Sequence, residues 1–190
     1  MRTVLSSIPP GVLTIADAKR GDIGNSARFY ASSVFDDLGF DSVTLSPYMG
    51  QDSLTPFLNY PGKCSFVLAR TSNPGGNDFQ TLNVAGQPLY SHVAKAVSGW
   101  AQDQPGTAGF VVGATDVSSL AQLRLELPEA PFLIPGVGSQ GGSAADVMKA
   151  AGSGPVLINS SRAIIYASDA LDFAQKASEQ AQITQNELGS

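Results

Sequence analysis

The sequence is poor in several residue types on which common protein chemistries depend. It has one cysteine, Cys64, so no disulfide can form within the chain, and one histidine, His92. A lone cysteine is most simply an inert thiol in a reducing compartment. His92 falls in a segment with helical spacing, away from every expected strand end. This position argues against a Ser-His-Asp triad and against a metal site built on histidine.

Charge and long apolar runs are scarce as well. Only 14% of the residues are charged, the net charge is −5, and no acidic or basic run stands out, so the overall field predicts no nucleic-acid partner. No stretch approaches the roughly 20 apolar residues of a membrane span. The start of the chain lacks the basic region, apolar run and cleavage site of a secretory signal. We therefore expect a cytoplasmic protein that binds neither nucleic acid nor a membrane.

Short apolar runs alternate with segments that have helical spacing. Runs of Val, Ile, Leu and Phe without polar alternation predict strands covered on both faces, as in a parallel sheet; they span residues 11–19, 41–47, 64–71, 108–115, 130–138 and 154–161. One intervening helix is expected from a capping Asn25 to Gly39. Another opens with Ser143 and Asp146 in capping-box spacing. A long final helix is expected over residues 168–182.

This order of elements predicts a single α/β domain over residues 1–190. A complete (β/α)8 TIM barrel takes about 250 residues, so a chain of this length corresponds to roughly six of the eight β/α units. A doubly wound open sheet is the alternative, but such a sheet usually carries a G-x-G-x-x-G turn after its first strand. The first strand here ends in DAKRGD, which favours the partial barrel.

Charged residues are concentrated in DAKRGDIG, where the first expected strand ends. Strand alternation places Asp17 and Lys19 side by side, and Asp22 follows beyond the strand. In parallel α/β folds, ligands bind at this edge of the sheet. Two carboxylates around an ammonium group can keep it protonated and aim it at a substrate. A structural ion-pair network is the alternative.

Polar residues also follow three later strands. In ARTSNPGG, Ser72 is placed to hydrogen-bond a polar heterocycle, and the long loop behind it could act as a lid. PGVGSQGG exposes backbone N–H groups to an anion, and Gln140 adds an amide donor. In NSSRAI, Arg162 beside Ser161 can hold a phosphate through two hydrogen bonds. Loops after the last two barrel strands form the usual phosphate site, although a plain tight turn is the alternative for the glycine-rich loop.

Together, DAKRGDIG, SNPG, PGVGSQGG and SSRAIIY closely resemble the orotidine 5′-monophosphate decarboxylase family, and the R-G-D-I-G form resembles its bacterial second-type subgroup. The resemblance covers nearly the whole chain, with the motifs in the family's order. It implies a homodimeric (β/α)8 barrel that acts as a carboxy-lyase of pyrimidine biosynthesis. Such an enzyme converts orotidine 5′-monophosphate to uridine 5′-monophosphate and CO2 without a metal or an organic cofactor.

The resemblance also implies roles for individual residues. Asp17 would face the carboxylate of the substrate, and Lys19 would stabilise and then protonate the C6 carbanion. Asp22 would reach across the dimer interface into the partner's site. The implied substrate-binding residues contact the ribose, the pyrimidine and the phosphate; they are Ser26, Ser72, Pro135, Gln140, Ser161 and Arg162.

The sequence departs from the family pattern in one respect. The family carries a further lysine and a ribose-binding aspartate on two strands for which this chain has no counterpart, because ten residues precede its first expected strand. Lys63 cannot replace that lysine, since it lies before its strand rather than after it. We therefore interpret the chain as lacking the first two β/α units. We expect poor stability or association through uncovered sheet edges, and weak or no decarboxylation.

Three other functions remain open on the residues alone. The same charge array serves sister enzymes that act on sugar phosphates through a Mg²⁺-stabilised enolate. A non-catalytic module that binds a phosphate ligand is the second alternative. A Schiff-base aldolase that uses Lys19 is the third, and it is disfavoured because two neighbouring carboxylates would keep the amine charged.

Overall fold

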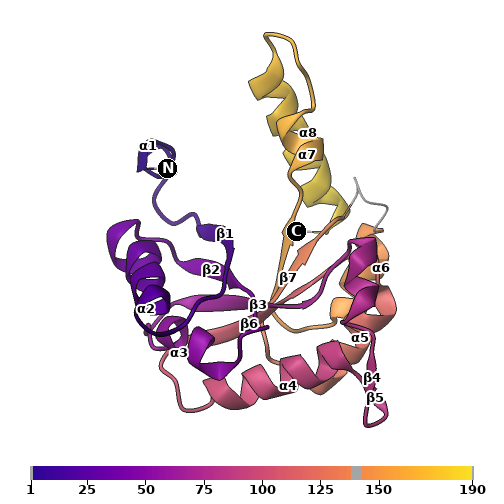
Figure 1. Ribbon diagram of the computed structural model, residues 1–190. Coiled ribbons are helices and arrows are strands. Elements are labelled where there is room, and N and C mark those ends of the chain that lie inside the picture. The colour runs from indigo at the N-terminus through magenta and orange to yellow at the C-terminus, as the bar shows by residue number, and fades with distance from the viewer. Residues whose placement is uncertain (1, 138–142, 190) are drawn as a thin grey trace. The chain divides into compact units, whose positions relative to one another are not determined.

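The computed structural model describes residues 2–137 and 143–189, in which strands and helices alternate along the chain (Figure 1). The strands of the main sheet are hydrogen-bonded in the order β1-β2-β3-β6-β7-β8; they span Ile15–Arg20, Ser42–Leu45, Cys64–Arg70, Thr107–Val112, Phe132–Pro135 and Val156–Asn159. The pairs β1–β2, β2–β3 and β7–β8 are parallel. This order follows the sequence without the reversal of a doubly wound sheet, so the barrel alternative is the correct one.

The remaining elements connect these strands. The helices are α1 (Arg2–Leu5), α2 (Gly24–Ser32), the π-helical η1 (Ser33–Asp37), α3 (Gln51–Leu58), the 3-10 helix η2 (Pro74–Asp78), α4 (Leu89–Ala101), α5 (Val117–Glu126), α6 (Ala144–Ala151), α7 (Arg162–Ile165) and α8 (Phe173–Glu187). A small antiparallel hairpin, β4 (Asn83–Val84) and β5 (Gln87–Pro88), precedes α4. Within the described residues, no helix is long and apolar enough to span a membrane.

The chain divides into two compact units. The first comprises Met1–Ala69 and Thr81–Val111. In this unit α2 packs against α3 (Figure 1). All four residues of β2 are buried, the polar Ser42 and Thr44 as well as the apolar Val43 and Leu45, so both faces of this strand are covered. Val43 and Leu45 are completely inaccessible to solvent.

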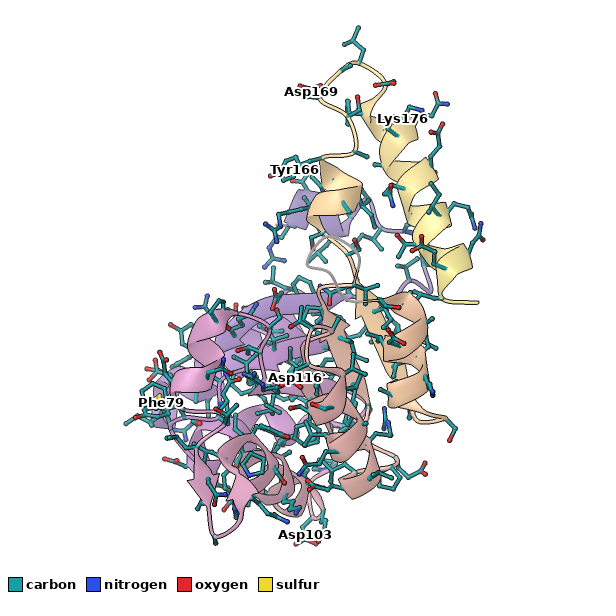
Figure 2. The ribbon with its side chains drawn as sticks, turned by 90° about the vertical axis from the view of Figure 1, so that its right-hand side faces the viewer. Phe79, Asp103, Asp116, Tyr166, Asp169 and Lys176 are labelled. Atoms are coloured by element: carbon teal, nitrogen blue, oxygen red, sulfur yellow. The ribbon has the colours of Figure 1, made fainter. Side chains whose placement is uncertain are left out.

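The second unit comprises Arg70–Gln80 and Val112–Ser190. Its core includes Phe132 and Ile134 of β7, and α5 packs against α6. The helices α7 and α8 pack against each other but bury none of their own residues; Figure 2 labels Tyr166 just after α7 and Lys176 on α8. The assignment of residues 1–190 to one domain stays a prediction.

The starts of two expected helices are wrong. Asn25 does not cap α2, because Ile23 is the extended residue before the helix and Asn25 already lies in the first turn. The Asn25 side chain instead accepts a hydrogen bond from Arg28. The final helix begins at Phe173 rather than at residue 168, because residues 168–172 form a turn before it.

Other local predictions are confirmed. The helical segment after β1 ends before Gly39, which has a φ of +74°, a conformation that glycine adopts without steric cost. Ser143 caps α6 by accepting the N–H of Asp146. The first strand is shorter than expected, because backbone pairing to β2 begins at Thr14, whose carbonyl accepts the N–H of Ser42 at 3.0 Å.

Candidate active site

The strand β1 departs from a regular ladder at the predicted charge cluster. Ala16 pairs with Val43 and Arg20 pairs with Leu45, so residues 17–19 of β1 stand opposite Thr44 alone. Lys19 has a φ of +46°, which lies in the left-handed region that residues other than glycine rarely adopt. A bulge of this kind re-aims the side chains at the end of a strand.

The bulge brings the first two predicted catalytic residues together. Lys19 Nζ lies 2.5 Å from Asp17 Oδ1. The hydroxyl of Thr44 donates to the same carboxylate oxygen at 2.9 Å and accepts the backbone N–H of Lys19 at 3.0 Å. The side chains of Asp17 and Lys19 are 64% and 51% exposed, whereas Thr44 is buried. A small ligand can therefore reach the ion pair, whereas Thr44, which supports the pair, is covered.

The surroundings of Asp17 favour its charged form. Partial burial acts to raise the pKa of this carboxyl, but the hydrogen bonds from Lys19 and Thr44 and the positive charge of Lys19 outweigh it, so the pKa is lowered. At neutral pH the site therefore presents a carboxylate beside an ammonium group. Such a pair can repel an incoming anion at one point and donate a proton at another.

Asp22 and Ser26 follow β1 at the start of α2. The backbone N–H of Ile23 donates to Asp22 Oδ1 at 2.8 Å. Asp22 is half-buried, and Ser26, in the first turn of α2, is exposed. The predicted reach of Asp22 into a partner's site remains a prediction.

The loop after β3 is held by Arg70, a buried side chain that no sequence pattern predicts. Its Nε donates to Asp116 Oδ2 at 2.9 Å and its Nη2 to Asn77 Oδ1 at 2.7 Å. Gln80 Oε1 accepts the backbone N–H of Thr71 at 2.8 Å. Asp116, labelled in Figure 2, also caps α5. These contacts join the two ends of segment 71–80 to each other and link the segment, through Arg70, to the start of α5.

Ser72 lies on this loop against Gly113. A Cβ at Gly113 would come within 2.8 Å of both the backbone nitrogen and the Cβ of Ser72, a separation at which one side must move. The Gly113 N–H donates to the carbonyl of Arg70 at 2.8 Å. The backbone at Ser72 is thus fixed by close packing, and its contact with a pyrimidine remains a prediction.

The predicted phosphate-binding residues lie at the ends of β7 and β8. Pro135 ends β7, in register with Asn159, the last residue of β8. The carbonyl of Ser161 accepts the N–H of Ile165 at 2.8 Å as α7 begins. Arg162 is the first residue of α7 and is exposed. Gln140 lies outside the described residues.

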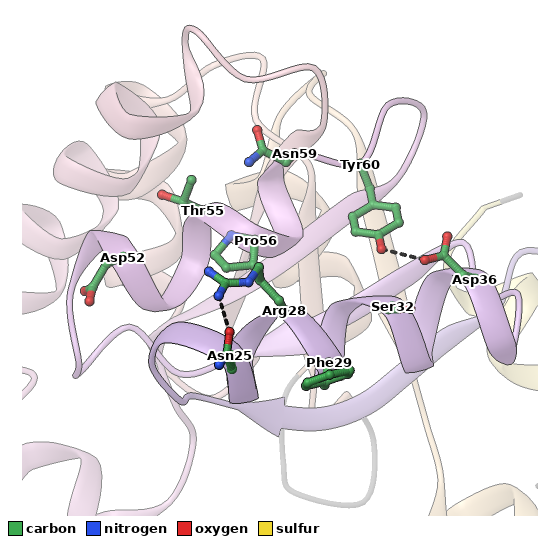
Figure 3. Close-up of a pocket in the computed structure, with 10 residues that line it drawn as sticks. All are labelled: Asn25, Arg28, Phe29, Ser32, Asp36, Asp52, Thr55, Pro56, Asn59 and Tyr60. Atoms are coloured by element: carbon green, nitrogen blue, oxygen red, sulfur yellow. Dashed lines mark hydrogen bonds between the residues drawn. The ribbon is translucent and has the colours of Figure 1, made fainter.

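A cavity of about 720 Å³ lies between α2 with η1 and α3 in the first unit (Figure 3). Arg28, Asp52 and Tyr60 are among the residues that line it, and the Tyr60 hydroxyl donates to Asp36 Oδ2 at 2.7 Å. No predicted site residue belongs to its lining. In residues 2–137 and 143–189, no group of three or more His, Cys, Asp and Glu side chains is placed to hold a metal ion.

Comparisons with known sequences agree with the motifs. A family model described as "Orotidine 5'-phosphate decarboxylase / HUMPS family" matches residues 4–177. The orotidine 5′-phosphate decarboxylase of Delftia acidovorans is 50% identical over 191 residues, which cover 97% of this chain and 69% of the relative. The protein of the same name from Christiangramia forsetii is 49% identical and covers 95% and 66%. The chain spans about two thirds of the length of these curated relatives.

Solved structures give the same result for the fold. The orotidine monophosphate decarboxylase of Leishmania donovani matches with a TM-score of 0.84 and 38% identity over 100% of this chain and 73% of that chain. The UMP synthase of the same organism matches with a TM-score of 0.85 and 40% identity over 98% and 42%.

The strand order, the bulged charge cluster and these neighbours define a (β/α)8-barrel protein of the decarboxylase class, present here as roughly six of the eight β/α units. The chain belongs to the orotidine 5′-phosphate decarboxylase family. The predicted family and fold class are therefore confirmed.

Proposed function

We propose that the chain acts as a carboxy-lyase that converts orotidine 5′-monophosphate to uridine 5′-monophosphate and CO2 in pyrimidine biosynthesis. One observation carries the proposal: Lys19 Nζ lies 2.5 Å from Asp17 at the end of β1, in a chain that is half identical to proteins named for this activity.

The reaction needs one proton donor and no redox partner. With Asp17 ionised beside the carboxylate of the substrate, the bond between C6 and that carboxylate breaks. CO2 leaves, and the electron pair stays on C6. The ammonium of Lys19 stabilises this charge and donates a proton to C6, after which solvent returns a proton to the amine.

The other predicted residues bind parts of the substrate that do not react. Binding energy from a remote phosphate can be directed to the reacting centre. The glycine-rich loop and the arginine that follows β8 can therefore raise the reaction rate by binding the phosphate. We assign Ser26 to the ribose and Ser72 to the pyrimidine. The phosphate is assigned to Pro135, Gln140, Ser161 and Arg162.

We further propose that the chain works in the cytoplasm as a homodimer in which Asp22 completes the partner's site. Mixing Lys19→Met chains with Asp22→Asn chains tests this directly. In a mixed dimer, one site then carries both substitutions and the other carries neither. Random mixing should restore activity to about one quarter of the wild-type sites, whereas no recovery would place Asp22 in its own chain's site.

Proton NMR in D2O tests the activity. Decarboxylation should yield uridine 5′-monophosphate with deuterium at C6, so the product shows no H6 signal and its H5 signal is a singlet that grows as the H5 signal of the substrate decays. Lys19→Met should abolish this conversion, and Lys149→Met, on the exposed surface of α6, should leave it unchanged. Binding of the product without any conversion of the substrate would favour a non-catalytic binding module instead.

A further inference from the structure

We propose that Thr44 is a positioning residue whose hydroxyl holds the carboxylate of Asp17 and the backbone of Lys19 in their reactive arrangement. The contacts are independent of any activity, but their catalytic meaning rests on the proposed decarboxylation. Thr44 lies on β2, outside the charged motif, and would not itself touch the substrate.

A single hydroxyl makes both contacts without conflict. A threonine hydroxyl has one proton to donate and lone pairs to accept with. Thr44 donates its proton to Asp17 Oδ1 at 2.9 Å and accepts the N–H of Lys19 at 3.0 Å. Because Thr44 is only 1% exposed, water cannot easily replace either contact. The hydroxyl is therefore the shared support of both charged residues.

The bulge explains why this support is needed. Residues 17–19 stand opposite Thr44 alone, so a side chain takes the place that a backbone carbonyl holds in a regular ladder. Lys19 is also held at a φ of +46°, and such backbone persists only where its surroundings fix it. The hydrogen bond from the N–H of Lys19 is made at the strained residue itself.

Packing alone does not call for a hydroxyl at this position. The neighbours of Thr44 on β2, Val43 and Leu45, are apolar and fully buried, and valine has nearly the same shape as threonine. A valine would fill the site but leave the N–H of Lys19 without this acceptor and Asp17 without this donor. A buried polar group that loses its partner is costly, so we expect the arrangement of the pair to loosen.

The charge on Asp17 provides a readout that does not depend on turnover. The interactions that favour its ionised form come from Lys19 on β1 and from Thr44 on β2. Removing the hydroxyl takes away one of them, so the pKa of Asp17 should rise. A change in packing that left the hydroxyl contact intact would not move it.

The experiment compares Thr44→Val, Thr44→Ala and Thr44→Ser in the full chain, with folding checked by circular dichroism. The Asp17 carboxyl is titrated by carbon-13 NMR, assigned with Asp17→Asn. We expect a raised pKa in the valine and alanine variants and a wild-type pKa in the serine variant. Equal pKa values in the wild type and the valine variant would overturn the proposal. If the valine variant fails to fold, the alanine and serine variants decide, because both lack the methyl group and only serine keeps the hydroxyl.

Kinetics supply the second readout. Because the hydroxyl of Thr44 donates to an ionised carboxylate, kcat should fall roughly tenfold or more in Thr44→Val. The KM should change little, because Thr44 does not contact the ribose or the phosphate, and Thr44→Ser should recover kcat. An unchanged kcat in the valine variant would contradict the role. A wild-type chain that does not decarboxylate would refute the proposed function, and the titration would still decide the role of Thr44.

Discussion

The buried ion pair of Arg70 and Asp116 gives the sharpest prediction about stability. Arg70→Met removes the guanidinium that bonds Asp116 at 2.9 Å and Asn77 at 2.7 Å. The two side chains of the pair are 10% and 25% exposed, so water screens them only in part. The pair holds the loop that carries Ser72, and its loss should be felt by the whole second unit.

The magnitude follows from the contacts that are lost. Removing one partner of a buried ion pair costs about 3 to 5 kcal/mol. Asp116 keeps its hydrogen bond to the N–H of Ser119, which places the expected loss at the low end, about 3 kcal/mol of unfolding free energy. For a chain of this size, that corresponds to a fall in Tm of about 6 to 12 °C.

The unfolding free energy lost in Arg70→Met should depend on pH. Burial acts to raise the pKa of Asp116, but hydrogen bonds, including that from Arg70, lower it overall. A carboxylate with a lowered folded pKa stabilises the fold above its unfolded pKa of about 3.9, and this contribution disappears as the pH falls through the folded value. The difference in stability between the wild type and Arg70→Met should therefore be largest near neutral pH and shrink below about pH 4.

Urea unfolding followed by circular dichroism measures this effect, with Asp116→Asn and the double variant completing a mutant cycle. Arg28→Met, at an exposed position on α2, is the control and should change stability by less than about 0.5 kcal/mol. A coupling energy between Arg70 and Asp116 below about 0.5 kcal/mol would show that the ion pair does not hold the loop in place.

Three further predictions concern binding and reactivity. Gly113→Ala should weaken the binding of uridine 5′-monophosphate about tenfold or more, because the added Cβ meets the backbone of Ser72. The control Gly99→Ala, whose Cβ would meet nothing within 4 Å, should bind the nucleotide normally. Equal affinities of the two variants in calorimetry would show that close packing at Gly113 does not support binding. Arg162→Ala should weaken binding of the same nucleotide by roughly ten- to a hundredfold while leaving uridine binding unchanged, and an equal loss for both ligands would remove the phosphate contact. Burial raises the pKa of the Cys64 thiol to about 12, so iodoacetamide at neutral pH should label it only after unfolding; rapid labelling of the folded chain, seen by mass spectrometry, would show that the thiol is open.

Local features of the chain could be predicted from the sequence because they depend on near neighbours. Asp17 and Lys19 could be expected to lie together because they are two residues apart on one strand, although the bulge at this point, rather than regular alternation, makes their contact. The end of a helix before Gly39 follows from the ease with which glycine adopts a positive φ. The expected cap at Asn25 fails because where the chain enters a helix depends on the path before it, not on the capping preference of one residue.

Features that join distant segments could not be predicted. The position of Thr44 opposite the bulge depends on the register between two strands, which neither strand specifies alone. Arg70 meets a partner 46 residues away along the chain, and its burial is invisible in a sequence where arginine is most often exposed. The supports of the site are therefore found only in the folded chain, whereas its charged groups are visible in the motif.

Release of labelled CO2 from the substrate shows directly whether this chain is a decarboxylase. Orotidine 5′-monophosphate carrying carbon-14 in its carboxyl group is incubated with the 190-residue chain and with Lys19→Met, purified in parallel to exclude a host enzyme. We expect the wild-type chain to release labelled CO2 in equal amount to the uridine 5′-monophosphate formed, and Lys19→Met to release none above background. Equal release from the two proteins, or no release from either, would show that Lys19 does not drive a decarboxylation in this chain.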